Sequence, residues 1–333
     1  MMDWSRKLRL PRILAALAVM VLGLGMPAAA EAQPLVGLHG AHVWPPSRVH
    51  SQKWNAKLLG VRERFVYDTV DGQALTLYVF HPRGIALHPR PVVIYIHGGA
   101  LRFGTAVISN RNTPHNRLLV SVERQLITRG MDFVSINYRL APLYPWPDPL
   151  IDVKHAVRFI ETHAKRLYIN QQQMAVMGDS AGGELSSFVG LTMRQSPHGG
   201  PLVRGVVDLF GPVNRRTFAL RWRKHHGLAP NPVYGVYTWK RVRRESAVSY
   251  VTPQAPPFLI IQGTRDHIVP PAQSRLLKAK LRHAGVPVQE ILVHHAGHEL
   301  VAKKGPIHPG ISFLAGHIVT FLAERLKSPS TAD

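Results

Sequence analysis

Hydrophobic residues along this chain occur in short runs, and stretches with helical spacing separate these runs. Continuous runs rich in β-branched residues, such as 91–96, are typical of strands buried on both faces of a sheet. The stretch 148–167, with apolar positions along one face, predicts an amphipathic helix. We expect core strands at residues 91–96, 132–138, 174–177, 202–210, 257–261 and 288–293, and helices at 117–129, 148–167, 181–193, 273–283 and 311–326.

Two further strands precede this alternation. Residues 63–69 and 73–80 are rich in aromatic and β-branched residues and flank the pair Asp71-Gly72. This pattern predicts an antiparallel hairpin. Strands that then alternate with helices favour an α/β fold. The prediction is therefore a mostly parallel central sheet of about eight strands, with helices on both faces.

The first residues of the chain do not fit this fold. Four basic residues precede an apolar run at 13–26, and small residues follow it up to Ala32. This is the pattern of a secretory signal peptide over residues 1–32, cleaved after Ala32 or alternatively after Ala30. An uncleaved membrane anchor is the other interpretation, although the run is shorter than the roughly 20 residues a spanning helix needs. A signal peptide implies a periplasmic or secreted protein.

The rest of the chain divides into three parts. Residues 33–59, which contain tryptophan and proline, are expected to form an N-terminal arm. Residues 60–327 form the α/β domain, in which an insertion at about 212–250 interrupts the alternation of strands and helices. Residues 328–333 are polar and are expected to be a disordered tail.

Ser180 lies between glycines in the sequence Gly-Asp-Ser-Ala-Gly, directly after a predicted strand and before a predicted helix. This setting predicts a nucleophile elbow, which exposes the serine hydroxyl above the edge of the sheet. The sharp turn requires small residues two positions before and after the serine. For an isolated match, an ordinary Gly/Ser-rich turn would be the preferred interpretation.

A glycine-rich loop follows the predicted strand 91–96. Such a loop can direct backbone N–H groups at the oxygen that becomes an anion during acyl transfer. We assign the oxyanion hole to Gly98, Gly99, Ala100 and Ala181. The N–H groups of the last three are the expected donors, and Gly98 gives the loop its freedom.

Two further candidates each follow a predicted strand. Asp266 lies after 257–261 and can orient an imidazole, whereas an Asx turn is its simpler interpretation. His298 follows 288–293 and is the expected general base. The order Ser180, Asp266, His298 is the order expected in α/β-hydrolases. Asp208, near the end of another strand, is the rival acid.

Taken together, these motifs resemble the α/β-hydrolase superfamily, on its hormone-sensitive-lipase-like and feruloyl-esterase-like side. The resemblance covers about residues 60–325 and rests on five segments. They are His97-Gly98-Gly99, Tyr138 to Pro142, Gly178 to Gly183, Asp266 in its Gly-x-x-Asp-x-x-Val-Pro setting, and Gly297-His298. Two positions depart from that pattern, because Ala100 and Glu299 stand where these families usually carry glycine. The methyl group of Ala100 is expected to narrow the pocket.

The resemblance implies a serine carboxylesterase, expected to hydrolyse short-acyl or aryl esters through an acyl-enzyme, and the pattern of residues 1–32 predicts that it is exported. The alternative is an exported serine peptidase or amidase of the same fold. No cofactor is expected, and the expected partner is a small-molecule ester. The chain contains no cysteine, so disulfides and a cysteine nucleophile are excluded. No metal site is expected, because adjacent histidines in a strand point to opposite faces.

The chain carries 41 lysine and arginine residues against 19 acidic ones, a formal net charge of +22. Residues 1–32 contribute +2, which leaves +20 for the remainder. Such a charge favours attachment to an anionic envelope or polysaccharide, and no specific nucleic-acid motif is present. A general solubility trait is an equally good interpretation. The insertion interleaves arginines with aromatic residues, which suits either a cap facing an acidic or aromatic ester or a solvated basic face.

Overall fold

The computed structural model describes residues 60–84, 86–108, 112–193 and 202–327. Its centre is an eight-stranded sheet with the order β1-β2-β4-β3-β5-β6-β7-β8. The strands are β1 Gly60–Val70, β2 Gln73–Pro82, β3 Arg90–Ile96, β4 Asp132–Ile136, β5 Ile169–Asp179, β6 Val206–Leu209, β7 Phe258–Gly263 and β8 Val288–Val293. The predicted signal segment, the arm 33–59 and the tail 328–333 lie outside the described residues.

The first two strands form the predicted antiparallel hairpin, and β2 also pairs antiparallel with β4. Asp71 and Gly72 both have positive φ, 50° and 75°. This geometry matches the right-handed twist of the two strands, which favours a tight hairpin turn. All other neighbouring strands are parallel. The sheet therefore confirms the predicted α/β class and strand number.

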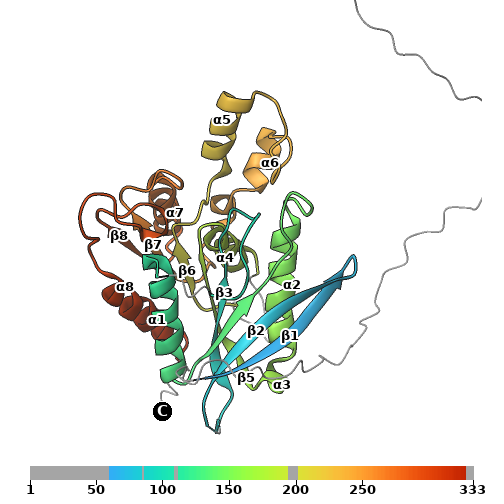
Figure 1. Cartoon of the computed structure of the whole chain (residues 1–333), viewed down its shortest axis with the longest axis vertical. Helices are drawn as coiled ribbons and strands as arrows, with labels where there is room; N and C mark the ends of the chain where they lie inside the picture. The colour runs from blue at the N-terminus through green and yellow to red at the C-terminus, as the bar shows by residue number, and fades with distance from the viewer. Residues whose placement is uncertain (1–59, 85, 109–111, 194–201, 328–333) are drawn as a thin grey trace, which may run out of the picture. The chain divides into compact units, whose positions relative to one another are not determined.

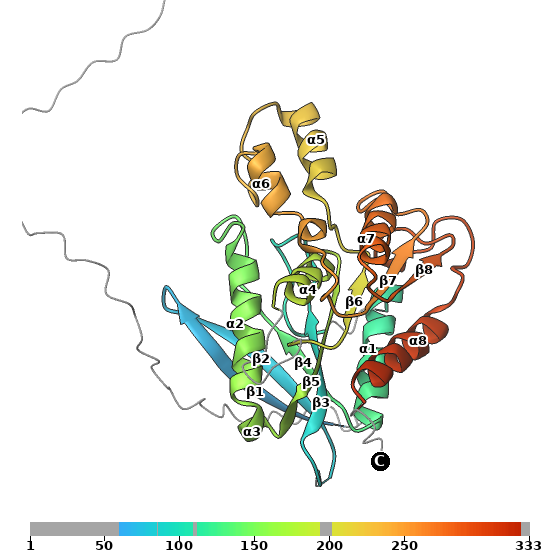
Figure 2. The same ribbon diagram turned by 180° about the vertical axis from the view of Figure 1, so that it is seen from behind.

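Helices cover the sheet on both faces, as Figures 1 and 2 show. Along β3, Val92, Ile94 and Ile96 pack into one hydrophobic cluster, with α2, α4 and α7. The alternate residues Val93 and Tyr95 pack into the other cluster, with α1 and α8. These helices are α1 Pro114–Thr128, α2 Asp148–Thr162, α4 Ala181–Thr192, α7 Ala272–His283 and α8 Ile311–Arg325.

Two elements differ from the sequence prediction. The helix expected over 148–167 ends at its C-cap His163, and a separate short helix, α3 Ala164–Leu167, follows. The strand expected over 202–210 is shorter, because the ladder with both neighbours begins only at Val206. Leu202 and Val203 are still buried, so their hydrophobicity reflects core packing rather than strand pairing.

The insertion forms a helical cap. It contains α5 Arg215–His226, α6 Trp239–Arg244 and a 3₁₀ turn, η1 Ala247–Tyr250. Figure 1 shows α5 and α6 projecting beyond α4, away from the body of the sheet. In the described part of the chain, no helix has both the length and the hydrophobicity needed to cross a bilayer.

Candidate active site

Ser180 occupies the turn between β5 and α4. Its backbone has φ 51° and ψ −117°, a conformation that L-residues rarely adopt. Strain of this kind persists only where the surrounding structure enforces it, and it clusters at functional sites. The strand-turn-helix arrangement is the nucleophile elbow that the sequence predicted.

The glycines on either side of Ser180 are required by close backbone approach. A Cβ at Gly178 would collide with the carbonyl of Gly182, and one at Gly182 would collide with the carbonyl of Ile96. These contacts press the turn against both β5 and β3. The expected need for small residues two positions from the serine therefore has a direct steric cause.

Three side chains meet where parallel strands end. His298 Nε2 lies 2.9 Å from Ser180 Oγ, and His298 Nδ1 lies 2.7 Å from Asp266 Oδ2. Ser180 follows β5, Asp266 follows β7 and His298 follows β8, so the sheet positions all three. With the Nδ1 proton donated to Asp266, Nε2 is left to accept the serine proton.

Asp266 is itself held in place. Its side chain is fully buried, and that of His298 is 12% exposed. Asp266 Oδ1 accepts hydrogen bonds from the backbone N–H groups of Ile268 and Val269, and Oδ2 also accepts one from Gln262 Nε2. These bonds satisfy the carboxylate and fix its orientation toward the imidazole.

Asp208, the rival acid, has other partners. Gly211 N–H donates to its Oδ1 and Ser187 Oγ donates to its Oδ2. Burial raises the pKa of Asp208 to about 6, although these two hydrogen bonds oppose the rise. This aspartate therefore ties the end of β6 to α4 and makes no contact with His298.

The glycine-rich loop differs in one respect from the sequence assignment. The N–H of Gly98 donates to Asp179 Oδ1 at 3.1 Å, so it is not available to an oxyanion. Gly98 also lacks a positive φ, and a Cβ there would collide with Asp179. Its role is therefore close packing rather than conformational freedom. Within the described ranges, the N–H groups of Gly99, Ala100 and Ala181 donate no hydrogen bond to another residue.

The two residues that depart from the pattern of the resembled family both adopt the left-handed region of backbone conformation. Ala100 has φ 55° and Glu299 has φ 55°. Glycine adopts this region without steric cost, whereas a residue with Cβ is strained there by about 1 kcal/mol. This strain gives a physical reason why glycine suits both positions.

Residues behind the loop brace it. The ring of His97 stacks on Tyr138 with centroids 4.3 Å apart, and Tyr138 Oη donates to the carbonyl of His97. Burial lowers the pKa of His97, which favours the neutral ring. Arg139 forms a two-pronged ion pair with the buried Asp152 on α2. The segment around Tyr138 is therefore structural.

A buried polar cluster behind the serine was not predicted. Asp179 Oδ1 accepts a hydrogen bond from Tyr95 Oη at 2.6 Å, and His115 Nε2 on α1 lies 3.4 Å from Asp179 Oδ2. Burial lowers the pKa of His115, but the negative charge of Asp179 outweighs the effect of burial, so the pKa of His115 is raised overall. Burial likewise opposes ionisation of Asp179, yet the charge of His115 and the Tyr95 bond lower its pKa. His115 lies 64 positions before Asp179 in the sequence, so no local motif around Ser180 identifies it.

A pocket of about 390 Å³ opens at Ser180, and residues of the cap line much of it. Arg102 and Arg221 contribute exposed cations, and Phe218, Trp222 and Tyr237 contribute aromatic surface. Residues of α5 thus line this pocket, whereas the basic residues of α6 do not.

One cap arginine is buried. Arg215 forms an ion pair with Glu184 on α4 and lies over the Tyr234 ring, 3.7 Å from its centroid. Burial raises the pKa of Glu184 to about 7, although the guanidinium opposes the rise. This contact fastens α5 to the sheet domain one helical turn after Ser180. In the sequence, this buried ion pair could have been suspected only from Glu184, a charged residue within the otherwise uncharged and mostly small run 181–187.

In the part of the chain that the structure describes, no group of three or more histidine, aspartate and glutamate side chains could hold a metal ion. His294 and His295 do not converge with His298 on a common point.

Comparison with known proteins places this arrangement in a family. The BD-FAE family profile matches residues 77–281, which contain the elbow, the glycine-rich loop, the cap and Asp266. This chain belongs to the BD-FAE family. The resemblance to α/β-hydrolase esterases drawn from its motifs is thereby confirmed.

Named relatives of this BD-FAE chain include mycobacterial esterases. Esterase LipC of Mycobacterium tuberculosis is 30% identical over 232 residues, which cover 66% of this chain and 55% of LipC. The probable carboxylic ester hydrolase LipM of the same organism is 28% identical, covering 70% of this chain and 54% of LipM. The chain spans about half the length of the curated relatives it matches.

Solved structures confirm the fold. A truncated carbohydrate esterase from gut microbiota aligns with a TM-score of 0.57 and 23% identity, covering 80% of this chain and 96% of that one. The propionate-bound Est2 esterase of Thermogutta terrifontis aligns with a TM-score of 0.61 and 20% identity, covering 80% and 95%. At such identities the likeness supports the α/β-hydrolase fold and nothing more.

Proposed function

We propose that this protein is a serine carboxylesterase in which Ser180 is the nucleophile, His298 the general base and Asp266 the orienting acid. The observation that carries the proposal is the continuous set of contacts from Ser180 Oγ through His298 to Asp266, at 2.9 Å and 2.7 Å. Membership of the BD-FAE family and the names of its relatives support ester hydrolysis.

The geometry supports a two-step reaction. Ser180 Oγ attacks the ester carbonyl carbon while His298 Nε2 takes its proton. The resulting oxyanion accepts hydrogen bonds from the N–H groups of Gly99, Ala100 and Ala181, each worth about 3 kcal/mol of the barrier. The C–O bond to the alcohol then breaks, and the alcohol leaves with the proton from His298. A water molecule, deprotonated by His298, releases the acid and restores Ser180.

We infer that the substrates are short-acyl or aryl esters. Ala100 lines the catalytic pocket, and its methyl group there limits the space for the acyl group. The cap adds aromatic rings and the cations of Arg102 and Arg221, which suit an aryl or acidic group through stacking and charge.

The test is hydrolysis of a 4-nitrophenyl ester series from acetate to palmitate, with the Ser180→Ala variant as control. We expect the highest kcat/KM on short chains and its loss in the variant by about 10⁴-fold or more. Peptide and anilide substrates are assayed in parallel. Ser180-dependent turnover of amides without turnover of esters would establish the alternative peptidase or amidase and overturn the esterase proposal.

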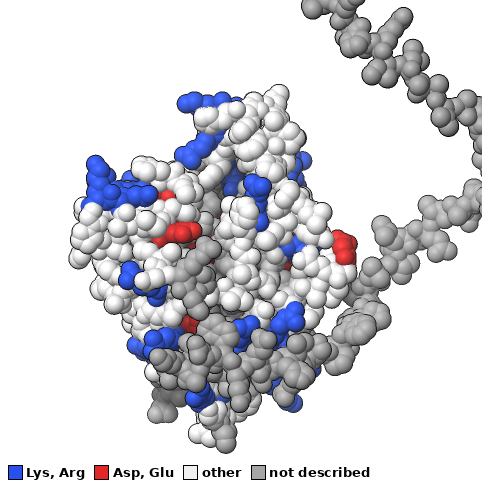
Figure 3. All heavy atoms as spheres, viewed as in Figure 1, with Lys and Arg blue, Asp and Glu red and all other residues white. Residues whose placement is uncertain are grey.

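We also infer that the protein is exported and that its basic surface binds an anionic envelope or polysaccharide. The basic, apolar and small-residue pattern of residues 1–32 supports export. On the face drawn in Figure 3, lysine and arginine side chains outnumber acidic ones, which supports attachment. N-terminal sequencing of protein from a cell fraction tests export, and salt-dependent binding to polygalacturonate tests attachment. A mature chain that retains Met1, or binding unaffected by salt, would contradict the respective inference.

A further inference from the structure

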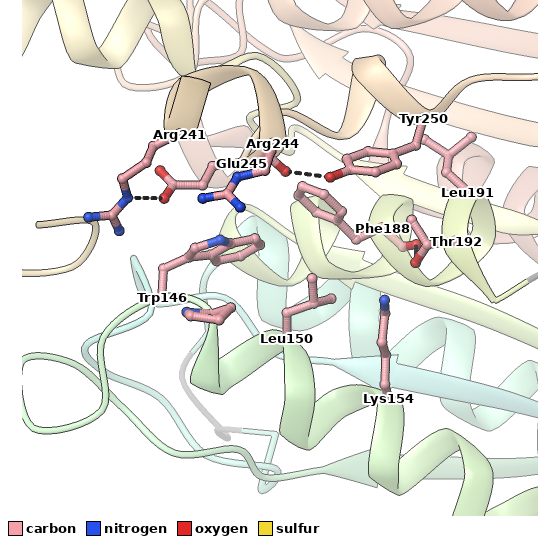
Figure 4. A pocket seen from close by; sticks show the side chains of 11 residues that line it. Trp146, Leu150, Lys154, Phe188, Leu191, Thr192, Arg241, Arg244, Glu245 and Tyr250 are labelled. Carbon is pink, nitrogen blue, oxygen red and sulfur yellow. Dashed lines mark hydrogen bonds and ion pairs between the residues drawn. The ribbon is translucent and has the colours of Figure 1, made fainter. Parts of the chain in front are cut away.

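A second pocket, of about 660 Å³, lies between α2, α4 and α6, and Ser180 is not part of its lining (Figure 4). Its deep surface is apolar, formed by the buried side chains of Trp146, Leu150, Phe188 and Leu191. The volume is in the range of pockets that hold small molecules. This cavity is large enough for a ligand of one or two rings.

Two aromatic rings separate this pocket from the catalytic one. Trp146 lines the second pocket and Tyr234 lines the catalytic pocket, and their ring centroids are 5.9 Å apart. The backbone N–H of Trp146 also donates to the carbonyl of Val233 in the cap. The two pockets are therefore neighbours, but they are lined by different residues.

The second pocket has an excess of positive charge. Its charged lining residues are Lys154, Arg241, Arg244 and Glu245. Arg241 Nε lies 3.0 Å from Glu245 Oε1, so this cation and the one carboxylate compensate each other. Within the described ranges, the side chains of Lys154 and Arg244 form no hydrogen bond or ion pair. Lys154 is thus left without a counter-charge, and Arg244 shares the charge of Glu245 with Arg241, so the lining keeps an excess of positive charge.

These two cations approach the cavity from opposite elements. Figure 4 shows Lys154 extending from α2 toward Phe188 and Thr192, and Arg244 reaching from α6 over Trp146. Lys154 is half-buried, and burial lowers the pKa of its amine. Removing a cation from water is unfavourable unless an anion compensates it. An anionic group between Lys154 and Arg244 would supply that compensation.

The pocket offers few groups to a sugar. The hydroxyl of Tyr250 donates to the carbonyl of Arg244, and that of Thr192 donates to the carbonyl of Phe188. Glu245 Oε1 is held by Arg241, and the buried Oε2 is the one carboxylate oxygen of the lining without a hydrogen-bond partner among the described residues. A ligand with many hydroxyls would leave them poorly paired, whereas a flat apolar ring would pack against the rings of the floor.

We propose that this pocket binds an aromatic carboxylate, with its ring against Trp146 and Phe188 and its carboxylate between Lys154 and Arg244. The site is distinct from the catalytic centre and does not depend on esterase activity. Its ligand has the chemistry of the acid released from an aryl-acyl ester, so product and ligand can be the same class of molecule.

The experiment is calorimetric titration of cinnamate into the full-length Ser180→Ala protein, with cinnamamide as the neutral analogue. We expect cinnamate to bind and cinnamamide to bind at least tenfold more weakly. The Lys154→Met change should raise Kd for cinnamate at least tenfold, because it removes the charge and keeps the apolar stem. Lys165→Gln, an exposed lysine on α3, is the matched control and should leave Kd unchanged.

A second variant tests the location without removing a charge. Thr192→Trp should fill the cavity and abolish high-affinity binding, while the catalytic-pocket change Arg221→Gln should raise Kd much less than Lys154→Met does. Cinnamate binding that is lost in Arg221→Gln and kept in Lys154→Met would place the anion in the catalytic pocket and overturn the proposal. Equal binding of cinnamamide, or tighter binding of galacturonate than of cinnamate, would also overturn it.

Discussion

The carboxylate of Asp179 accepts a hydrogen bond from the backbone N–H of Gly98, 81 positions earlier in the chain, at 3.1 Å. The residue just before Ser180 therefore fixes the loop that carries Gly99 and Ala100. The same oxygen accepts the Tyr95 hydroxyl, and the other oxygen faces His115. The position of the proposed oxyanion donors relative to Ser180 is thus expected to depend on this one buried carboxylate.

Removing this carboxylate should impair catalysis more than substrate binding. We expect Asp179→Ala to lower kcat by about 10²-fold with little change in KM, because misplacing one oxyanion donor costs about 3 kcal/mol. Asp179→Asn is the matched control, since its amide oxygen can still accept the Gly98 bond, and it should retain most of the activity. Steady-state kinetics on 4-nitrophenyl acetate at 25 °C measure both. Equal losses in the two variants would mean that the Gly98 contact does not position the hole.

The two buried aspartates should respond differently to the same substitution. Asp266→Asn should lower kcat by about 10³- to 10⁴-fold, because the amide no longer favours the required tautomer of His298. Asp208→Asn should stay within about threefold of the wild type, since Asp208 bonds only Gly211 and Ser187 among the described residues. The comparison of kcat values decides which aspartate acts with His298, and the reverse order would reassign the acid.

Asp208 should make stability depend on pH. Its pKa is raised from 3.8 to about 6 by burial, so the folded state holds the proton more tightly than the unfolded state. The contribution of Asp208 to the free energy of unfolding is therefore most favourable below the pKa of this group in the unfolded chain, and it is lost as pH rises through about 6. We expect the stability of the wild type relative to Asp208→Asn to fall by about 2 kcal/mol between pH 4 and pH 7.5. Urea unfolding of both proteins at the two pH values measures this difference, and a constant difference would contradict it.

Ala100 should limit the size of the acyl group. Ala100→Gly removes a methyl group that lines the catalytic pocket. We expect the ratio of kcat/KM for butyrate to that for acetate to rise about fourfold, which corresponds to the roughly 0.8 kcal/mol of one methyl-sized group. Relief of strain at φ 55° roughly offsets the greater freedom of glycine in the unfolded chain, so the melting temperature should change little. An unchanged ratio would place the acyl group elsewhere.

Arg221 should contribute to selectivity for acidic esters. It is exposed and lines the catalytic pocket, whereas Arg223 on the same helix does not. Arg221→Gln should raise KM for 4-nitrophenyl hydrogen succinate about two- to fivefold, as expected for an exposed charge pair, and leave KM for 4-nitrophenyl butyrate unchanged. Arg223→Gln is the control. An effect that persists in 1 M salt would argue against a charge interaction.

Much of this architecture could be predicted from local sequence. The strands around β3 and β7 are continuous apolar runs, and burial on both faces of a parallel sheet requires that composition. The turn at Ser180 could be recognised because its glycines stand at fixed positions around the serine, and the close approach between Gly178 and Gly182 is local. The exact residue at which a strand such as β6 begins could not be predicted. Hydrogen bonding to the neighbouring strands, rather than hydrophobicity, determines where the pairing starts.

The sequence by itself determined the fold class, the elbow and the order of the candidate residues, because these depend on periodicity and on short-range sterics. Only the tertiary structure decided that Asp266 rather than Asp208 contacts His298, and that the N–H of Gly98 is already bonded. It alone separated the cap cation Arg221, which faces the catalytic pocket, from Arg244, which faces the second one. The physical reason is that each of these relations joins residues far apart in the chain, and their distances are set by strand order and by the paths of the loops between strands.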